Sequence, residues 1–320
     1  MPQDVQLIEV LVVNGLKVFM QRSIHLSRWF CTAAVFFGLV MFVPDGIEDD
    51  VDAPTVRLLI SLSRGTLVIC GGGEISDEVL NEFVDAAGGE AARIVVITTA
   101  TETADSDDIE DEMEFWRAQK LARLTVLHTR SRETANDPEF ASPLADATGI
   151  WFVGGNQGWL ADTYVGTICE QMIHGVMQRG GVVGGISAGA AVMSSVMIRD
   201  GATSPEIGRG FGLLPGTVID QHFLARNRQE RLLGALAAHP GLIGLGIDEG
   251  AALVVRGCRL NVIGDSDVVA CIPPSSGRPA KVETLRPGEH ANLLKMSLAA
   301  NKSRKTRPVI RMGTSDSAGD

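Results

Sequence analysis

Three residues of the chain have side chains suited to nucleophilic hydrolysis. Ser187 is the central residue of the segment 185–189, GISAG, which fits the pattern G-x-S-x-G of a nucleophile elbow. His222 and Glu249 each follow an apolar run further along the chain. A serine hydroxyl attacks a carbonyl group at neutral pH only when a base takes its proton, and a carboxylate can orient and stabilise a histidine that does so. The three residue types together are suited to acyl transfer by a serine nucleophile, a histidine base and a carboxylate.

Each of the three residues also has a purely structural interpretation. The pentapeptide suits a tight packing turn between a strand and a helix, and a lone histidine or an acid after a strand often has only a structural role. Of the six histidines, only His222 lies among other polar groups outside the N-terminus, the helices and the tail. Asp248 and Glu249 are adjacent, and strand side chains alternate between faces, so we expect only one of them to point at His222.

The elements that must position these residues begin at Gly65. From there, short apolar runs alternate with helical stretches, which predicts an α/β fold with a mainly parallel sheet and helices on both faces. Ser187 then lies at a strand-to-helix turn. Because the carboxyl ends of parallel strands share one edge of a sheet, we expect the triad to converge there. The predicted strands are 65–73, 92–100, 123–129, 149–157 and 182–187, and the predicted helices are 76–89, 114–122, 160–181 and 188–196.

The C-terminal part of this region has a different pattern. Apolar runs at 242–248, 251–257 and 259–265 follow one another closely, which favours an antiparallel edge. We therefore predict one domain of catalytic size over 65–294. The polar residues 295–320 are expected to form a disordered tail.

Residues 1–64 are predicted to be an N-terminal extension. Residues 29–43, WFCTAAVFFGLVMFV, form a continuous apolar run after Arg22 and Arg28. The run resembles an export signal or membrane anchor, but no Ala-x-Ala site follows it, and it is shorter than the roughly 18 to 20 residues that span a bilayer. An extension that adds nothing to the fold and a core-packing helix stay open as alternatives. We expect a cytoplasmic protein, with export or anchoring through 29–43 as the alternative.

Composition excludes several classes of function. The formal net charge of −11 and the pI near 5.1 oppose unselective binding to nucleic acid or to an anionic membrane. The five cysteines are scattered, with no C-x-x-C and no Cys/His cluster at metal spacing, so we expect neither a metal nor a disulfide framework. The glycines at 71–73 lack the G-x-G-x-x-G and P-loop patterns, which favours a close-packed turn over nucleotide binding, and no cofactor is expected.

Four ordered motifs carry a family resemblance. GGNQ at 154–157, GGISAGAAVM at 184–193, DQHFLARNRQERL at 220–232 and GIDEGAA at 246–252 resemble the cyanophycinases, serine peptidases related to the aspartyl dipeptidases of the peptidase E group. The resemblance covers the chain from Gly65 to about Asp267. It implies Ser187 as nucleophile, His222 as general base and Glu249 as the acid, within a fold of the class I glutaminase type.

The resemblance also implies where substrate binds. For the oxyanion hole we select the backbone N–H groups of Ala188, beside the nucleophile, and Gly155, where a missing side chain allows close approach. Gln157, Asp220 and Gln221 match substrate-contacting positions of the family. Three arginines after His222, namely Arg226, Arg228 and Arg231, are suited to hold carboxylates through bidentate hydrogen bonds, although a solvated helix face explains them as well.

These features predict a serine exopeptidase that hydrolyses β-linked aspartyl peptides. The family's substrate, cyanophycin, is a polyaspartate with arginine joined to each side-chain carboxyl, and its cleavage releases β-aspartyl-arginine from the carboxyl end. Two alternatives stay open: an α-aspartyl dipeptidase of the peptidase E type, and a non-catalytic protein that binds acidic peptides. The resemblance further implies a homodimer.

Overall fold

The computed structural model describes residues 6–13, 16–23, 64–106, 108–273 and 280–304. The chain divides into two compact units, Met1–Val51 and Asp52–Asp320. The described part of the first unit is an antiparallel hairpin of strands β1 (Gln6–Val13) and β2 (Leu16–Ser23). The apolar run at 29–43 lies outside the described residues.

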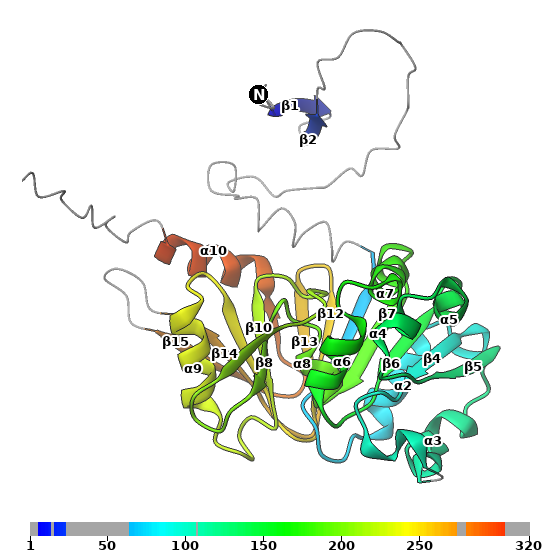
Figure 1. The fold of residues 1–320 in the computed structure, drawn as a ribbon. Helices are drawn as coiled ribbons and strands as arrows, with labels where there is room; N and C mark the ends of the chain where they lie inside the picture. The colour runs from blue at the N-terminus through cyan, green and yellow to red at the C-terminus, as the bar shows by residue number, and fades with distance from the viewer. Residues whose placement is uncertain (1–5, 14–15, 24–63, 107, 274–279, 305–320) are drawn as a thin grey trace, which may run out of the picture. The chain divides into compact units, whose positions relative to one another are not determined.

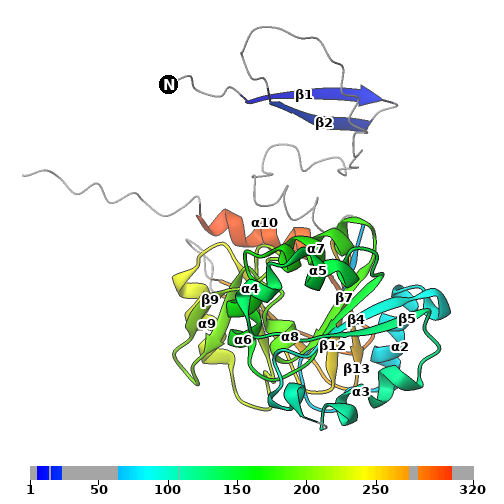
Figure 2. The same cartoon turned by 45° about the vertical axis from the view of Figure 1, so that its right-hand side comes forward.

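An eight-stranded sheet forms the centre of the second unit (Figures 1 and 2). Its strand order is β16-β13-β12-β3-β7-β6-β4-β5. The five strands from β3 to β5 in that order are parallel, and the other three extend the sheet in antiparallel fashion. The strands are β3 (Thr66–Cys70), β4 (Arg93–Ile97), β5 (Arg123–Leu127), β6 (Gly149–Phe152), β7 (Val182–Ile186), β12 (Ala251–Arg256), β13 (Arg259–Gly264) and β16 (His290–Asn292).

Helices cover both faces of this sheet because its central strands are apolar on both sides. A Cβ atom on Gly184 of β7 would meet Phe83 of helix α2 (Asp77–Ala86), whereas one on the next residue, Gly185, would meet Gly189 of helix α8 (Ala188–Ala191). Successive strand residues point to opposite faces, so α2 and α8 lie on opposite sides. Helix α7 (Ile168–Gln178) packs near β6 and β7. The predicted α/β architecture, with a mainly parallel sheet and helices on both faces, is confirmed.

A second sheet of four strands differs from the prediction. It has the order β10-β11-β14-β15, with β10 (Thr217–Gln221) parallel to β11 (Ile243–Ile247) and the strands β14 (Val268–Ile272) and β15 (Lys281–Leu285) antiparallel. The antiparallel edge expected at 242–265 is correct for β12 and β13 only, because β11 belongs to this second sheet. Its parallel pair packs against α9 (Gln229–Ala238), and a Cβ on Gly244 would touch Leu232 and Leu236 of that helix.

A hairpin and several short helices complete the unit. The hairpin consists of β8 (Val196–Asp200) and β9 (Glu206–Arg209), and it forms a two-stranded sheet. The remaining helices are α3 (Ile109–Ala118), α4 (Arg132–Ala135), α5 (Pro138–Ala141), α6 (Gln157–Tyr164) and α10 (Leu293–Arg304).

Two predicted helices are interrupted or shorter in the structure. The helix expected at 160–181 is two helices, α6 and α7, because Gly166 has φ +82° and its N–H donates to the carboxylate of Glu170 (2.5 Å). The helix expected at 188–196 ends at Ala191, and β8 begins at Val196.

The C-terminal segment also differs from its prediction. Residues 293–304 form α10, so the disordered tail expected from Lys295 does not begin there. The first turns of α10 bury Leu293 and Ala300, and the helix packs near β11 and β14. Apolar burial therefore holds this segment in place despite its polar composition. Residues 305–320 lie outside the described part of the chain.

Candidate active site

The nucleophile elbow lies between β7 and α8. Ser187 has φ 53° and ψ −106°, a backbone conformation that is strained for a residue with a side chain. Small neighbours make this turn possible: a Cβ on Gly189 would stand 2.4 Å from the carbonyl oxygen of Phe152. The N–H of Ser187 donates to the carbonyl of Cys70 at 3.0 Å, which ties the turn to the neighbouring strand β3.

The histidine and the acid come from the smaller sheet. His222 directly follows β10, and Glu249 follows β11 at the carboxyl end of the parallel pair. The structure places Ser187 Oγ 2.8 Å from His222 Nε2, and His222 Nδ1 2.5 Å from Glu249 Oε1. Because a carboxylate only accepts, Nδ1 carries the proton, and Nε2 is left to accept from the serine hydroxyl. This is the hydrogen-bond order of a general-base triad.

The triad therefore joins two sheets, whereas the sequence led us to expect one sheet edge. The glycine loop 71–73 after β3 makes the junction. His222 N–H donates to the carbonyl of Gly71 at 2.8 Å, and a Cβ on Gly72 would stand 2.3 Å from His222 Cε1. A Cβ on Gly73 would stand 2.9 Å from the Cβ of Glu249. These glycines form the close-packed turn that the sequence favoured.

Asp248 fixes the loop that carries His222. Its Oδ1 accepts from the backbone N–H groups of Leu224 and Ala225, both at 2.9 Å, and its Oδ2 accepts from the hydroxyl of Ser266 at 3.1 Å. Asp248 and Glu249 thus point to different partners, as strand alternation requires. The positioning role of Asp248 was not foreseen in the sequence, because its partners are backbone groups that no motif reveals.

The surroundings of His222 favour its neutral form. Burial lowers the pKa of His222 below its ordinary value, and the positive charges of Arg226 and Arg228 act in the same direction. The hydrogen bond and charge of Glu249 act in the opposite direction but do not outweigh burial. A histidine that is neutral at physiological pH is able to accept the serine proton.

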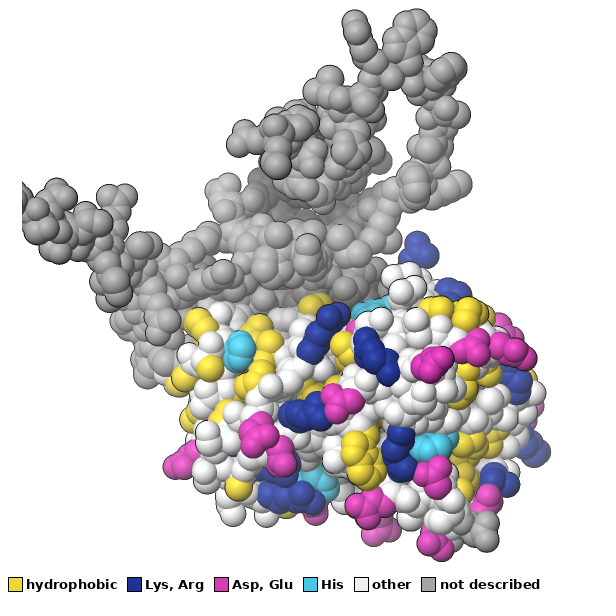
Figure 3. Space-filling view, viewed as in Figure 1, with side chains coloured by type: hydrophobic (Ala, Val, Ile, Leu, Met, Phe, Trp, Pro, Cys, Tyr) yellow, Lys and Arg dark blue, Asp and Glu magenta, His cyan; other side chains and the backbone are white. Residues whose placement is uncertain are grey.

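A cavity of about 680 Å³ opens in front of Ser187 and His222. Its lining is mainly polar and contains both signs of charge. On the face of the molecule drawn in Figure 3, basic and acidic side chains are interspersed rather than segregated into patches of one sign. The cavity is lined by Gly73, Gly155, Asn156, Gln157, Trp159, Asp162, Ile186, Ser187, Arg199, Asp200, Glu206, Gln221, His222, Arg226, Arg228 and Arg231.

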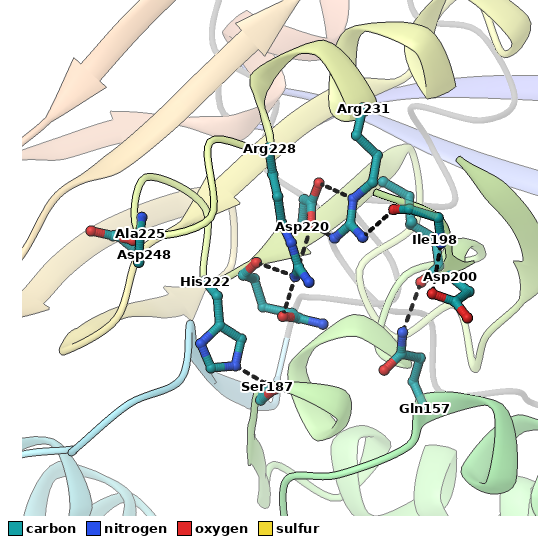
Figure 4. A network of polar contacts seen from close by, with 12 residues as sticks. Gln157, Ser187, Ile198, Asp200, Asp220, His222, Ala225, Arg228, Arg231 and Asp248 are labelled. Atoms are coloured by element: carbon teal, nitrogen blue, oxygen red, sulfur yellow. Dashed lines mark hydrogen bonds and ion pairs between the residues drawn. The ribbon is translucent and has the colours of Figure 1, made fainter. Parts of the chain in front are cut away.

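Two of the three selected arginines are bound to protein groups (Figure 4). Arg231 is buried and donates through Nε to Asp220 Oδ2 at 3.1 Å and through Nη2 to Oδ1 of the same carboxylate. Arg228 Nη1 donates to the backbone and side-chain oxygens of Gln221, both at 2.6 Å, and lies 3.6 Å from Asp220. Burial lowers the pKa of Arg228 to about 10, so it remains a cation at neutral pH. A solvated helix face does not describe Arg231, which is 4% exposed.

The other selected residues occupy different positions. Arg226 lines the cavity, is exposed, and has no ion-pair partner within the described residues. Gln157, at the start of α6, directs its amide nitrogen at the backbone of β8, 2.6 Å from the carbonyl of Arg199. Asp220 is buried behind the cavity wall and does not line it, so it holds arginines instead of facing substrate.

The two selected oxyanion residues flank the serine. Ala188 is the first residue of α8, directly after Ser187. Gly155 lies in the loop after β6 with φ +126°, and a Cβ there would stand 2.1 Å from the carbonyl oxygen of Ala100. Only glycine fits this approach. The adjacent Gly154 is the neighbour of the serine itself, because a Cβ there would lie 3.7 Å from the Cβ of Ser187.

Four charged residues of the cavity were missed by the sequence analysis. Arg199 of β8 forms a bidentate ion pair with Asp162 of α6, at 2.8 and 2.5 Å, and Asp200 and Glu206 belong to the same β8–β9 hairpin. They match no catalytic pattern, so only the fold reveals them.

The described residues contain neither a cluster of metal-binding side chains nor a membrane-spanning helix. No group of three or more His, Cys, Asp or Glu side chains there is arranged to hold a metal ion. None of the helices in the described ranges has the length and apolar character needed to cross a bilayer.

Comparison with known proteins places these features in a family. The chain is 32% identical over 222 residues to a cyanophycinase of Synechococcus elongatus, covering 66% of this chain and 69% of that protein. It is 34% identical over 208 residues to a cyanophycinase of Geminocystis herdmanii, covering 60% and 75%. The crystal structure of a peptidase from an acI-B1 actinobacterium has 26% identity and a TM-score of 0.54, covering 72% of this chain and 98% of that one.

A family model agrees with the catalytic type that the elbow indicates. The model of Peptidase family S51 matches residues 67–263. This range runs from β3 to β13 and includes the site residues that come from both sheets. With the similarity to the two cyanophycinases over two thirds or more of their length, this match assigns the chain to serine peptidase family S51.

Proposed function

We propose that this S51 peptidase is an exopeptidase that hydrolyses β-linked aspartyl peptides, with cyanophycin as its substrate. The observation that carries the proposal is the unbroken series of hydrogen bonds from Ser187 through His222 to Glu249 at the wall of a polar cavity. The same cavity contains a guanidinium, that of Arg226, with no ion-pair partner in the described part of the chain.

In the proposed reaction, Ser187 Oγ attacks the scissile carbonyl carbon while His222 Nε2 takes the hydroxyl proton. Glu249 stabilises the imidazolium that forms at His222. The N–H groups of Ala188 and Gly155 donate to the developing oxyanion. His222 then gives its proton to the leaving amine, which breaks the peptide bond and leaves an ester on Ser187. Water, deprotonated by His222, hydrolyses that ester and restores the enzyme.

The charges of the cavity support an acidic peptide as substrate. A unit of cyanophycin at the carboxyl end presents a free α-carboxylate. The exposed Arg226 can bind that carboxylate through two parallel hydrogen bonds. Arg228 adds positive charge close by, although one of its nitrogens is taken by Gln221. The relatives that carry the name cyanophycinase are consistent with this chemistry.

Two alternative functions make different predictions. An α-aspartyl dipeptidase of the peptidase E type would use the same triad on Asp-x dipeptides. A non-catalytic binder of acidic peptides would leave Ser187 unreactive. The homodimer suggested by the family resemblance also remains a prediction, which sedimentation of the purified protein tests, and so does the compartment.

A substrate panel with a serine-reactive phosphonate separates these functions. We expect release of β-aspartyl-arginine from cyanophycin and from β-aspartyl-arginine oligomers, little release of amine from Asp-x dipeptides, and phosphonate labelling confined to Ser187. Turnover of Asp-x dipeptides alone would favour the dipeptidase. Absence of both labelling and turnover would favour the binder and contradict the proposal.

A further inference from the structure

The charged groups of the cavity divide into those with a protein partner and those without. Arg199 is paired with Asp162, and Arg231 and Arg228 share Asp220. Within the described residues, three cavity-lining groups form no ion pair: the cation Arg226 and the carboxylates of Asp200 and Glu206. The cavity therefore offers an uncompensated charge of each sign to a ligand.

The two unpaired carboxylates lie on the β8–β9 hairpin, which three side chains fasten to the rest of the site. Gln157 Nε2 donates to the carbonyls of Arg199, at 2.6 Å, and Ile198, at 3.3 Å. Arg199 itself is joined to Asp162 of α6. From the opposite side, Arg231 Nη1 donates to the carbonyl of Gly201 at 2.7 Å. The hairpin is thus held from α6 and from α9 at once (Figure 4).

These contacts change the role of two residues that the sequence suggested as substrate ligands. The amide nitrogen of Gln157 is used by β8, and the guanidinium of Arg231 is used by Asp220 and Gly201. Neither donor is free for a substrate carboxylate. Both residues instead determine where the hairpin lies, so they are positioning residues.

Asp200 is the better placed of the two unpaired carboxylates. It ends β8 beside Gly201, whose N–H donates to Asp200 Oδ1 at 2.7 Å and whose carbonyl is the one bound by Arg231. The charge of Asp200 acts on Arg228, two residues from the unpaired Arg226, whereas the charge of Glu206 acts on Arg199, which is paired with Asp162.

We propose that the β8–β9 hairpin determines the substrate specificity of the active site. Asp200 is the residue of this hairpin that binds the cationic end of the substrate. This inference rests on the proposed function. A β-aspartyl-arginine unit carries a carboxylate and a guanidinium, and the unpaired Arg226 and Asp200 supply one partner for each. Selectivity for the guanidinium is then a property of the hairpin and not of the triad.

The test replaces arginine in the substrate by citrulline, which has nearly the same shape and no charge. We expect wild-type kcat/KM to be higher for β-aspartyl-arginine oligomers than for β-aspartyl-citrulline oligomers. Asp200→Asn should lower the value for the arginine oligomer about five- to tenfold, mainly through KM, as expected for one solvent-accessible charge pair. The citrulline oligomer should be cleaved by the variant as by wild type.

Two further variants sharpen the test. Glu206→Gln, on the same hairpin and in the same cavity, should keep the preference for arginine. Gln157→Leu should reduce that preference, because the hairpin loses the hydrogen bonds from Gln157 to the carbonyls of Ile198 and Arg199. An Asp200→Asn variant that keeps the full preference, or loses both substrates equally, overturns the proposal.

The failure of the proposed function gives a different result. If wild type cleaves neither oligomer, the exopeptidase assignment fails and this inference fails with it. If wild type cleaves both oligomers equally well, the exopeptidase assignment stands and only the role of Asp200 is overturned.

Discussion

The two sheets of the second unit contribute to the site in different ways. The large sheet supplies the nucleophile on a strained turn, where backbone geometry and small residues around Ser187 do the positioning. The small sheet supplies His222 and Glu249 on loops that polar contacts hold, among them the two backbone N–H groups bound by Asp248. Close packing of small residues is therefore the main constraint on Ser187, whereas hydrogen bonds are the main constraint on the loops of His222 and Glu249.

This difference indicates which parts of the site tolerate change. A turn whose glycines pack directly against neighbouring backbone has no room for a side chain at those positions. A loop held by several hydrogen bonds loses one contact at a time, and each is worth about 1 to 3 kcal/mol when a charged group is involved. The site is accordingly expected to be more sensitive at the glycine loop 71–73 than at either hydrogen bond from Asp248 to the loop that carries His222.

The largest expected effect comes from removing the hydrogen bond between Ser187 and His222, which links the two sheets. Ser187→Ala and His222→Ala should each lower kcat about a million-fold, as for triad residues that act as a unit. The double variant should be no slower than either single variant. Single-turnover kinetics on β-aspartyl-arginine oligomers would measure these rates. A double variant in which the two losses add would contradict a shared role of the two sheets in one step.

Removal of the charge at Glu249 comes next. Glu249→Gln should lower kcat by about 10³ to 10⁴ because the partner that orients and stabilises His222 is weakened. The matched control is Asp248→Asn, next in sequence, which keeps an oxygen for Leu224 and Ala225. A larger loss of kcat in the control than in Glu249→Gln would reverse the assignment of the acid.

The glycine junction gives a third prediction. Gly72→Ala places a Cβ 2.3 Å from His222 Cε1 at φ +126°, so it should lower turnover about 100-fold by displacing the imidazole. Gly216→Ala is the control, since Gly216 also has positive φ (+79°) but no atom within 4 Å of the added Cβ. Both variants should lose about 1 to 2 kcal/mol of unfolding free energy from backbone strain. Chemical denaturation and turnover, measured together, separate strain from displacement, and equal turnover in the two variants would contradict the contact.

The smallest expected effect is a shift in pH dependence. His222 must be neutral to act, and its pKa lies below the ordinary value, so kcat/KM should persist through the usual histidine range and fall only as pH falls through that lowered pKa. Arg226→Gln removes one of the charges that lower it, so the pKa rises and the acid limb moves to higher pH. Arg259→Gln, whose guanidinium bonds Asn261, should leave the limb in place. A shift of the limb to lower pH in Arg226→Gln would refute this account.

Much of the fold was predictable because its signals are local. The parallel strands from β3 to β7 appear as short apolar runs ending in small residues, and the elbow follows from glycine and alanine around Ser187. The separation of β10 and β11 into another sheet was not predictable, since pairing is decided by contacts between distant strands. The break between α6 and α7 was missed although its signal is local, because the helical periodicity of the apolar residues continues across Gly166, whose N–H donates to the carboxylate of Glu170 four residues later.

The sequence predicted which types of residue the site contains, but not the contacts that several of them make. The arginine-rich segment after His222 indicated carboxylate binding, yet Arg231 is bound to a buried carboxylate, and of the three arginines only Arg226 forms no ion pair with the described residues. Asp200 and Arg199 belong to no motif and enter the site because the β8–β9 hairpin folds over the cavity.

By itself, the sequence determined the kind of chemistry and the elements that bear it, because residue type, glycine content and apolar periodicity are local properties of the chain. Only the tertiary structure decided which side chains meet. Hydrogen bonds and ion pairs act over a few ångströms, so Ser187 and His222 become partners only when two sheets pack against each other through the glycine loop. The division of charges into paired and unpaired groups, on which the proposed substrate selection rests, is decided by the same packing.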